Sequence, residues 1–361
     1  MSRKMGPVPI FRRVLSGLTA AVLLASQVTL PPMAEASHLG SSTASAGSAP
    51  PPSLSVTQSF QPDLFTGRAT TAIPLAVPPG RKGMQPGLAL AYSSSGRNGW
   101  LGVGWGLDTG YIERSTKNGV PKYDGSDTFS FMLQGVSSDL VRIPDGTYRA
   151  KDEGLFLRVE SKGVSGWEIR DKSGTRYLFG QTAASQIESL GQVFRWSLDQ
   201  VIDTSGNTVT FTYAKDQGQL YPARIEYTAH PATGRSATNR IDFLLEEQTR
   251  PDVERTYRHG NETPLVTAKR LQYVEMRTLM DGAWALARRY ILVYETSART
   301  GRSLLASIAH VGTNGQSRLP ATRFTYSSTD APTYTVTSSN PTTSTAAWNV
   351  RWGTDVLGQQ N

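Results

Sequence analysis

Short runs of alternating apolar and polar residues, separated by turn signals, form the main pattern of this chain from about Leu54 onward. β-branched and aromatic residues dominate most of these runs, as strands with one buried face favour. Asn-Gly pairs begin at 98, 118 and 314, and Asp-Gly pairs begin at 124, 145 and 281. Strands that follow one another with turns and no intervening helices predict an all-β fold of antiparallel hairpins in large curved or packed sheets. The clearest candidate strands are Thr128–Leu133, Leu155–Glu160, Arg176–Phe179 and Arg195–Ile202.

One segment, Pro264–Leu279, is compatible with either an amphipathic helix or a strand. In an extended conformation Leu271 and Tyr273 share one face, while Val274 and Met276 share the other. The Asp-Gly pair at 281 and the strand-like run at 288–295 follow it. These neighbours favour a hairpin over a helix.

The first 36 residues have the pattern of a secretory signal peptide. Basic residues precede an apolar run from Val14 to Val28, and Ala34-Glu35-Ala36 is a small-residue cleavage site. An uncleaved membrane anchor is the alternative, but the run is short and interrupted by polar residues. Arg12-Arg13 also permits twin-arginine export, although general secretion is favoured. We therefore expect a secreted, extracellular protein without a membrane span after cleavage.

The rest of the chain divides by composition into three parts. Residues 37–53 are rich in Ser, Ala, Gly and Pro and predict a disordered linker. Residues 54–328 carry the strand pattern and predict one β domain. Residues 329–361 begin as a Ser/Thr-rich linker, and Trp348–Trp352 then looks like the start of a following, truncated module.

Composition removes several classes of chemistry. The 361 residues include no cysteine, which excludes disulfides, thiol catalysis and a lipoprotein anchor. The formal net charge is +8, but no basic run is interleaved with aromatic residues. Nucleic acid is therefore not an expected partner.

The segment 85–114 contains the most unusual spacing in the chain. After an alternating strand at 88–92 come Gly102, Gly104 and Gly106, with Trp100 and Trp105 among them. Glycine gives a strand no side chain to pack, so this spacing predicts the close approach of another backbone or a large ring. A nucleotide-binding loop does not fit, because neither G-x-G-x-x-G before a helix nor a Walker lysine is present. We expect these five residues to be structural.

The strand–turn–strand unit at 196–213 has weaker relatives at 167–180 and 304–326. Each of the three contains a Gly-bearing turn, and the unit at 196–213 resembles a YD-type repeat. Repeated hairpins that bury one face against their neighbours would build a curved shell. We favour a repeat relationship among these units, and the alternative is that any antiparallel protein contains such hairpins.

Residues capable of catalysis or metal binding occur without a supporting pattern. The four histidines (His38, His230, His259 and His310) show no zinc spacing. Asp203, Ser205 and Asn207 have the first spacings of a calcium loop but lack its later glycine and glutamate, so turn hydrogen bonding explains them more simply. No G-x-S-x-G elbow occurs, and the Glu246-Glu247 pair has no partner carboxylate in view. We expect no catalytic residue, cofactor or metal.

Four tryptophans, Trp100, Trp105, Trp167 and Trp196, are predicted to anchor the core. An aromatic platform for sugars is the alternative for one of them. No cluster of amide and acidic residues accompanies any of the four, which favours the core.

Residues 66–83 and 85–114 together closely resemble the opening of the SpvB-type N-terminal domain. SpvB-like virulence proteins and the B components of insecticidal Tc toxin complexes share this domain, which is related to RHS/YD-repeat shell proteins. The resemblance implies a non-catalytic structural module of a toxin, forming part of a shell or scaffold for a toxic partner domain. RHS-type shell or toxin components, in the same or another chain, are the implied partners.

The enzymatic activity of the family is not implied for this chain. The ADP-ribosyltransferase pattern needs a Ser-Thr-Ser strand and a Glu-x-Glu pair, and neither tripeptide occurs here. A cell-surface or carbohydrate-binding module and a cryptic hydrolase remain as alternative functions.

Overall fold

A computed structural model describes residues 61–62, 67–189 and 191–326. The predicted signal peptide, the linker at 37–53 and the segment 329–361 lie outside the described residues. Within the described part, no helix is long and apolar enough to cross a membrane.

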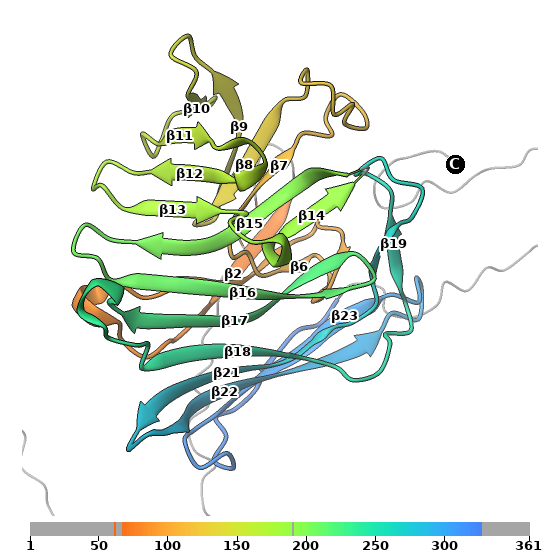
Figure 1. The fold of residues 1–361 in the computed structure, drawn as a ribbon. Coiled ribbons are helices and arrows are strands. Elements are labelled where there is room, and N and C mark those ends of the chain that lie inside the picture. The colour runs from red at the N-terminus through yellow and green to blue at the C-terminus, as the bar shows by residue number, and fades with distance from the viewer. Residues whose placement is uncertain (1–60, 63–66, 190, 327–361) are drawn as a thin grey trace, which may run out of the picture. The chain divides into compact units, whose positions relative to one another are not determined.

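The predicted all-β architecture is confirmed (Figure 1). Apart from single 3-10 turns, the described chain consists of strands that pair antiparallel. The 3-10 turns are η1 (Arg81–Gly83), η2 (Gly163–Ser165), η3 (Ala183–Ser185) and η4 (Pro231–Thr233). The strands are β1 (Gln61–Pro62), β2 (Ala69–Leu75), β3 (Leu88–Ser93), β4 (Asn98–Gly99), β5 (Gly102–Val103), β6 (Trp105–Gly106), β7 (Tyr111–Arg114), β8 (Phe129–Leu133), β9 (Val136–Arg142), β10 (Tyr148–Ala150), β11 (Arg158–Ser161), β12 (Trp167–Arg170), β13 (Arg176–Phe179), β14 (Gln186–Ser189), β15 (Gln192–Ile202), β16 (Thr208–Asp216), β17 (Gln219–Ala229), β18 (Asn239–Leu245), β19 (Glu254–Thr256), β20 (Leu265–Thr267), β21 (Leu271–Met280), β22 (Ala283–Thr296), β23 (Ser303–Val311) and β24 (Thr322–Arg323).

Strands β7 to β13 and β15 close into a ring of hydrogen-bonded strands. Each strand from β7 to β13 pairs with the next, and both β7 and β13 then pair with β15. The ring can close because β15 is long enough for its two halves to pair with different strands. Its first half lies between β14 and β7, and its second half lies between β13 and β16. Closing a sheet in this way removes exposed strand edges within the ring.

From the second half of β15 the sheet continues as an open layer. The order is β16, β17, β18, β21, β22, β23 and β24, and each strand is antiparallel to its neighbour. The strands from β16 to β23 lie below the ring in Figure 1. This layer and the ring therefore belong to one continuous sheet joined through β15.

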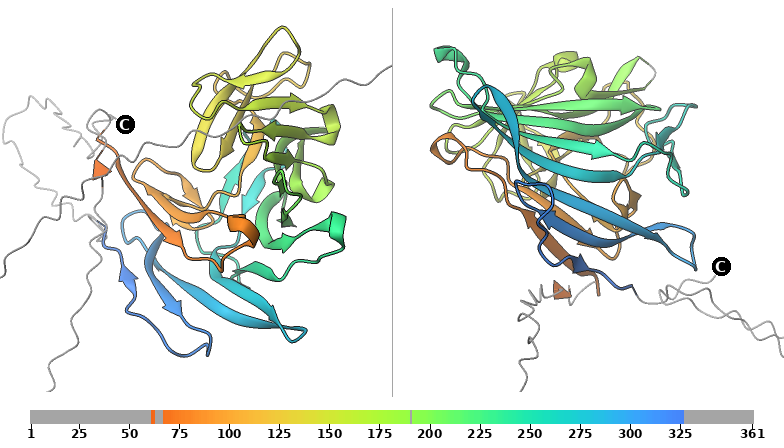
Figure 2. Two further views of the ribbon diagram at one scale, coloured as in Figure 1. Left: turned by 90° about the vertical axis from the view of Figure 1, so that its left-hand side faces the viewer. Right: turned by 90° about the horizontal axis from the view of Figure 1, so that it is seen from below.

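A smaller sheet of β1, β2, β3 and β6 packs beside the open layer. Figure 2 shows β2 and β3 (orange) next to the C-terminal strands β22 and β23 (blue). Several hydrogen bonds tie the chain after β2 to the open layer, and three of them involve side chains of Tyr290, Tyr227 and Asn239. The Tyr290 hydroxyl accepts from Ala76 N at 2.9 Å. Tyr227 Oη donates to Pro78 O at 2.8 Å, and Asn239 Nδ2 donates to Pro79 O at 3.1 Å.

Aromatic side chains fill the end of the ring where β8 and β12 begin. Trp167 lies T-shaped against Phe129 and Trp196, with ring centroids 4.8 Å and 5.8 Å away. Tyr148 completes the group at 5.1 Å from Trp167. Trp167 is 1% exposed and Trp196 is 3% exposed. The ring therefore encloses a packed core.

Several local predictions can be compared with these strands. The ambiguous segment at 264–279 is extended, and β21 and β22 form the predicted hairpin around Asp281-Gly282. The predicted strand Arg176–Phe179 has the bounds of β13, whereas Leu155–Glu160 reaches the ladder only from Arg158.

The prediction of a turn at Asn98-Gly99 is wrong. These two residues form β4 and pair with β5, and the turn is made by Trp100 and Leu101. Asn98 is held in the strand by long-range side-chain bonds, described below, that override its local turn preference.

Candidate functional site

The glycine-rich segment at 96–106 is folded more tightly than a single strand would be. β4 and β5 form a minimal hairpin, whereas β6 pairs with β3 in the smaller sheet. Gly104 lies between β5 and β6 with φ +80° and provides the change of direction. The period-two glycines therefore belong to two different sheets.

Two of the three glycines have no room for a side chain. A Cβ on Gly102 would lie 2.6 Å from Ser303 O, and one on Gly104 would lie 2.5 Å from Tyr92 Cε2. Both residues also have positive φ, which favours glycine. A Cβ on Gly106 would meet nothing within 4 Å, and its φ is not positive, so nothing in the structure explains this glycine.

A buried arginine holds this segment from the far side. The Arg250 side chain is 0% exposed and donates to Gly99 O at 2.6 Å and to Asn98 Oδ1 at 2.7 Å. It also pairs with Asp252 at 2.8 Å. Asp252 in turn accepts from Ser303 N at 2.6 Å and from Asn98 Nδ2 at 3.0 Å. We call Asn98, Arg250, Asp252 and Ser303 the arginine lock.

The electrostatics of the lock favour the charged form of Asp252. Burial raises the pKa of this carboxyl, but hydrogen bonds from Arg250 and Ser303 outweigh burial and hold the pKa well below its usual range. The lock joins three stretches of chain that are far apart in sequence. No periodicity marks Arg250, so sequence reasoning missed it; an arginine and an aspartate two residues apart are too common to signal a buried pair.

Trp100 and Trp105 both contact other aromatic rings. Trp100 lies 6.1 Å from Tyr221 and 6.4 Å from Phe243. Trp105 is 3% exposed, lies 4.7 Å from Phe324, and donates from Nε1 to Tyr326 Oη at 2.9 Å. Their contacts are with the protein itself, which leaves little aromatic surface for a ligand.

Four buried carboxylates of the sheet are paired with arginines. Glu113 on β7 pairs with Arg195 on β15 at 2.5 Å and with Arg258 at 3.1 Å. Glu168 on β12 pairs with Arg176 on β13 at 2.9 Å. Hydrogen bonds from Arg176 and Arg170 lower the pKa of Glu168 to about 2 against the opposing effect of burial. Asp242 and Glu275 have the same arrangement across β17, β18, β21 and β22. Such charged, doubly paired groups are poor general acids or bases at neutral pH.

Asp199 on β15 is a buried carboxylate held by hydroxyl and amide groups. It accepts from Ser185 Oγ at 2.8 Å, from Thr182 Oγ1 at 3.2 Å and from the backbone of Gln181. Burial raises its pKa despite these bonds. It lines an open cavity of about 570 Å³ with Leu178, Phe211 and Tyr213.

A cavity of about 1000 Å³ lies between the smaller sheet and the main one. The small side chains of Ala72 and Ala91 form part of one wall, and Tyr177 and Phe211 form part of the other. Asp108 lines the same cavity, and burial raises the pKa of its carboxyl. No arrangement of nucleophile and base accompanies this carboxylate among the lining residues.

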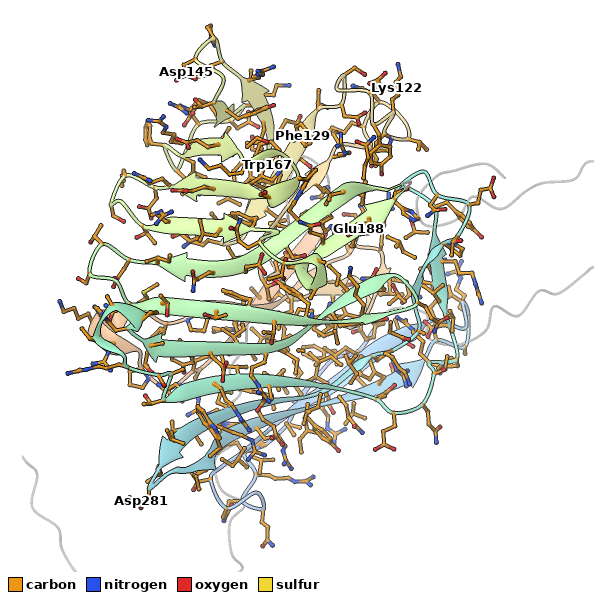
Figure 3. All side chains as sticks on the ribbon, in the orientation of Figure 1. Lys122, Phe129, Asp145, Trp167, Glu188 and Asp281 are labelled. Atoms are coloured by element: carbon orange, nitrogen blue, oxygen red, sulfur yellow. The ribbon has the colours of Figure 1, made fainter. Side chains whose placement is uncertain are left out.

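A third cavity, of about 390 Å³, lies at the aromatic end of the ring. Figure 3 labels three of the residues that line it, Phe129, Trp167 and Glu188. Phe129, Trp167 and Trp196 line it together with Arg114 and Glu188. The Nε1 atoms of both tryptophans are buried and have no hydrogen-bond partner. Both indoles lie edge-on to neighbouring rings, so aromatic faces surround them. Arg114 is already engaged by Asp127 at 2.7 Å.

The proposed turn role of Asp203 is confirmed. Its carboxylate accepts from Ser205 N at 2.9 Å, from Asn207 N at 2.8 Å and from Asn207 Nδ2 at 2.7 Å. Asp124 likewise accepts from Ser126 N at 2.9 Å. Across the described chain, no group of three or more His, Cys, Asp or Glu side chains is placed to hold a metal ion.

Taken together, the closed ring and the open layer define an all-β module whose fold also occurs in solved Tc toxin structures. Residues 64–243 match the family model of the Salmonella virulence plasmid 65kDa B protein, SpvB. The chain thus carries an SpvB-type domain, as the sequence resemblance predicted.

Curated relatives agree with this assignment. The chain is 31% identical over 181 residues to the mono(ADP-ribosyl)transferase SpvB of Salmonella choleraesuis (strain SC-B67), and 30% identical over 181 residues to that of Salmonella typhimurium. Each match covers 42% of this chain and 30% of the relative. The chain therefore matches less than a third of the length of these relatives.

Solved structures show the same fold. A crystal structure of TcdB2-TccC3 superposes with a TM-score of 0.62 at 22% identity, covering 74% of this chain and 16% of that chain. The Photorhabdus luminescens Tc holotoxin pore gives 0.61 at 21% identity, with 72% and 16% covered. The N-terminal domain of effector protein SpvB from Salmonella typhimurium strain LT2 gives 0.56 at 21% identity, with 66% and 98% covered.

Proposed function

We propose that this chain supplies a non-catalytic structural module of a secreted toxin or virulence protein, contributing to a shell or scaffold for a toxic partner domain. The observation that carries the proposal is the shared fold: 74% of this chain superposes on 16% of a much longer chain of a Tc toxin complex. A module of this size in a larger assembly needs partners, and RHS- or Tc-type shell or toxin components are the candidates.

The chemistry of the described residues supports a non-catalytic role. Glu113 and Glu168 of the sheet are paired with arginines, Asp199 is held by hydroxyl and amide groups, and the arginine lock, Trp100 and Trp105 have internal contacts. We propose that Gly102 and Gly104 serve the same structural purpose, by allowing close packing against Ser303 and Tyr92. The names of the curated relatives include a transferase activity. That name describes the whole relative, and this chain matches 30% of the length of the relative.

Two measurements test the proposal. The chain without residues 1–36 should co-purify as a defined complex with an RHS- or Tc-type component encoded beside it, when the two are expressed together. It should not transfer label from radioactive NAD to proteins of a host-cell extract. Transfer of label, or a chain that stays monomeric beside every such neighbour, would contradict the proposal.

The export hypothesis has its own test. Secreted material should begin at Ser37 when its N-terminus is sequenced, because Ala34-Glu35-Ala36 is the expected cleavage site. Full-length protein that retains Met1 in the cytoplasm would oppose it.

The carbohydrate-binding alternative receives less support. Trp105, Trp167 and Trp196 are each at most 3% exposed, so their faces are not free to stack on a sugar ring. A glycan array separates the two functions, because the structural module should bind no glycan.

A further inference from the structure

A small hairpin, β19 and β20, covers the second hydrophobic cluster of the described chain. Leu265 at the start of β20 packs with Ile187, Phe194 and Leu220. Phe194 is 0% exposed and Ile187 is 2% exposed. We call residues 257–264, the loop that joins β19 to β20, the clasp.

Few bonds fasten the clasp to the rest of the sheet. Arg258 donates to Glu113 Oε2 at 3.1 Å, and Tyr123 Oη donates to His259 O at 2.6 Å. At the foot of the clasp, Val266 N donates to Gln217 O at 3.1 Å. β19 and β20 pair with each other as a separate two-stranded sheet, so no ladder to the main sheet supports them.

His259 lies at the centre of the clasp and is almost completely enclosed. It is 1% exposed, and its ring lies 6.2 Å from that of Phe194 in a T-shaped arrangement. Its Nδ1 atom is buried and has no hydrogen-bond partner. A neutral imidazole tolerates this position, whereas an imidazolium would leave a buried N–H donor and a buried charge unpaired.

The buried carboxylate that the clasp contacts is already neutralised, because Glu113 is shared by Arg195 and Arg258. The other carboxylates of the clasp and of β14, Glu262 and Glu188, are exposed to solvent. The charged and titratable residues on the elements packed against His259 are Tyr257, Arg258 and Glu262 of the clasp, Tyr111, Glu113 and Arg114 of β7, Arg195 of β15, Glu188 of β14, and Lys122, Tyr123, Asp124 and Asp127 of the preceding loop.

The direction of the pH dependence follows from this environment. Burial first, and the neighbouring Arg258 second, lower the pKa of His259 from its ordinary value of 6.5, and they outweigh a hydrogen bond with the Thr263 backbone that raises it. The closed clasp therefore binds a proton less readily than the open one. Its stability contribution is complete above about pH 6.5 and is lost as the pH falls below that value.

We propose that the clasp is an acid-released cover: protonation of His259 detaches residues 257–264 from Phe194 and exposes this side of the apolar cluster. The module would then present a new apolar surface in an acidic compartment while the ring and the open layer stay folded. Loss of the clasp need not unfold the ring, because β19 and β20 have no strand pairing with it.

Hydrogen exchange of the full chain at pH 7.5 and pH 5.5, corrected for the intrinsic effect of pH, tests the proposal. Wild-type residues 254–267 should exchange faster at pH 5.5 by up to about tenfold, because this pH lies one unit below the ordinary histidine pKa of 6.5. Strands β8 and β12 should keep their protection. A dye that fluoresces on apolar surface should gain intensity over the same pH range.

Two variants and one control separate titration from simple damage. His259→Phe keeps an aromatic ring beside Phe194 but cannot be protonated, so its exchange should not respond to pH. His259→Gln provides a second non-titrating side chain if the first variant folds poorly. His310→Phe is the matched control, because burial also lowers the pKa of His310, which stacks on Tyr290 away from the clasp.

The proposal fails on either of two results. Wild-type protection of residues 254–267 that is equal at both pH values would show that the clasp stays closed. If residues 254–267 of both His259 variants still exchanged faster at pH 5.5 than at pH 7.5, a titratable group other than His259 would be responsible for the opening.

Discussion

The ring and the arginine lock hold the chain by opposite means. In the ring, strands that are consecutive in sequence pair with one another, and large side chains such as Trp167 fill the interior. In the lock, segments near residues 98, 252 and 303 converge. Glycines at 102 and 104 let the backbones approach closely there, and side-chain hydrogen bonds join the segments. The ring is thus a product of local pattern and apolar volume, whereas the lock is a product of long-range polar contacts.

The contrast predicts where each kind of damage appears. Trp167→Ala removes a side chain that is 1% exposed and touches three other aromatic rings. We expect a loss of about 3–5 kcal/mol in the free energy of unfolding, typical of a buried tryptophan replaced by alanine. Urea unfolding measures the loss, and hydrogen exchange should locate it first in β8 and β12. A loss under 1 kcal/mol would mean that the ring is not held by its aromatic core.

Arg250→Met should cost about as much for a different reason. The substitution keeps the volume but leaves the Asp252 carboxylate buried without its cation, and removing one partner of a buried pair costs about 3–5 kcal/mol. Exchange should rise in β4 and β5 before it rises in the ring. The matched control is Arg158→Met, since Arg158 is 58% exposed in its pair with Glu160 and should change stability by less than about 1 kcal/mol.

Gly104→Val tests the close packing that accompanies the lock. Overpacking against Tyr92 and Ser93 costs about 1–3 kcal/mol, and the positive φ adds about 1–2 kcal/mol. Gly106→Ala is the control within the same segment and should change stability by less than about 0.5 kcal/mol, because nothing lies within 4 Å of the added Cβ. A thermal melt of both variants beside wild type gives the comparison. Equal effects at the two positions would oppose the role given to Gly104.

The smallest effect is expected from an ion pair on the ring. The pKa of Glu168 is lowered from 4.5 to about 2 by Arg176 and Arg170, whose side chains are 41% and 54% exposed and therefore well screened. Its contribution to stability is complete above about pH 4.5 and is lost as the pH falls toward 2. Subtracting the Glu168→Gln pH profile from that of wild type isolates this contribution. A flat difference between pH 5 and pH 2 would contradict it.

These differences also explain what could be predicted from sequence. The hairpins around Ser173-Gly174 and Asp281-Gly282 followed from turn residues and alternation, because their partners are near in the chain. The spacing of Gly102 and Gly104 predicted the close approach of another backbone or a ring, but nothing in the sequence identified Ser303 or Tyr92 as the neighbours. Asn98-Gly99 was assigned to a turn because local preference cannot register a bond to Arg250, which lies 152 residues away.

The histidines show the same limit. The four histidines are alike in showing no metal spacing, yet the structure buries His259 and stacks His310 on Tyr290. Burial depends on how β19 and β20 pack, and neither short strand has a periodicity long enough to reveal it.

The divided edges of β15 have a mechanical consequence. One backbone carries hydrogen bonds to β14 and β7 in its first half and to β13 and β16 in its second. A force directed along this strand would therefore load its hydrogen bonds to the open layer and to the ring together rather than one at a time. If this module sits in the wall of a larger assembly, tension from one side would be carried across it without separating its two halves.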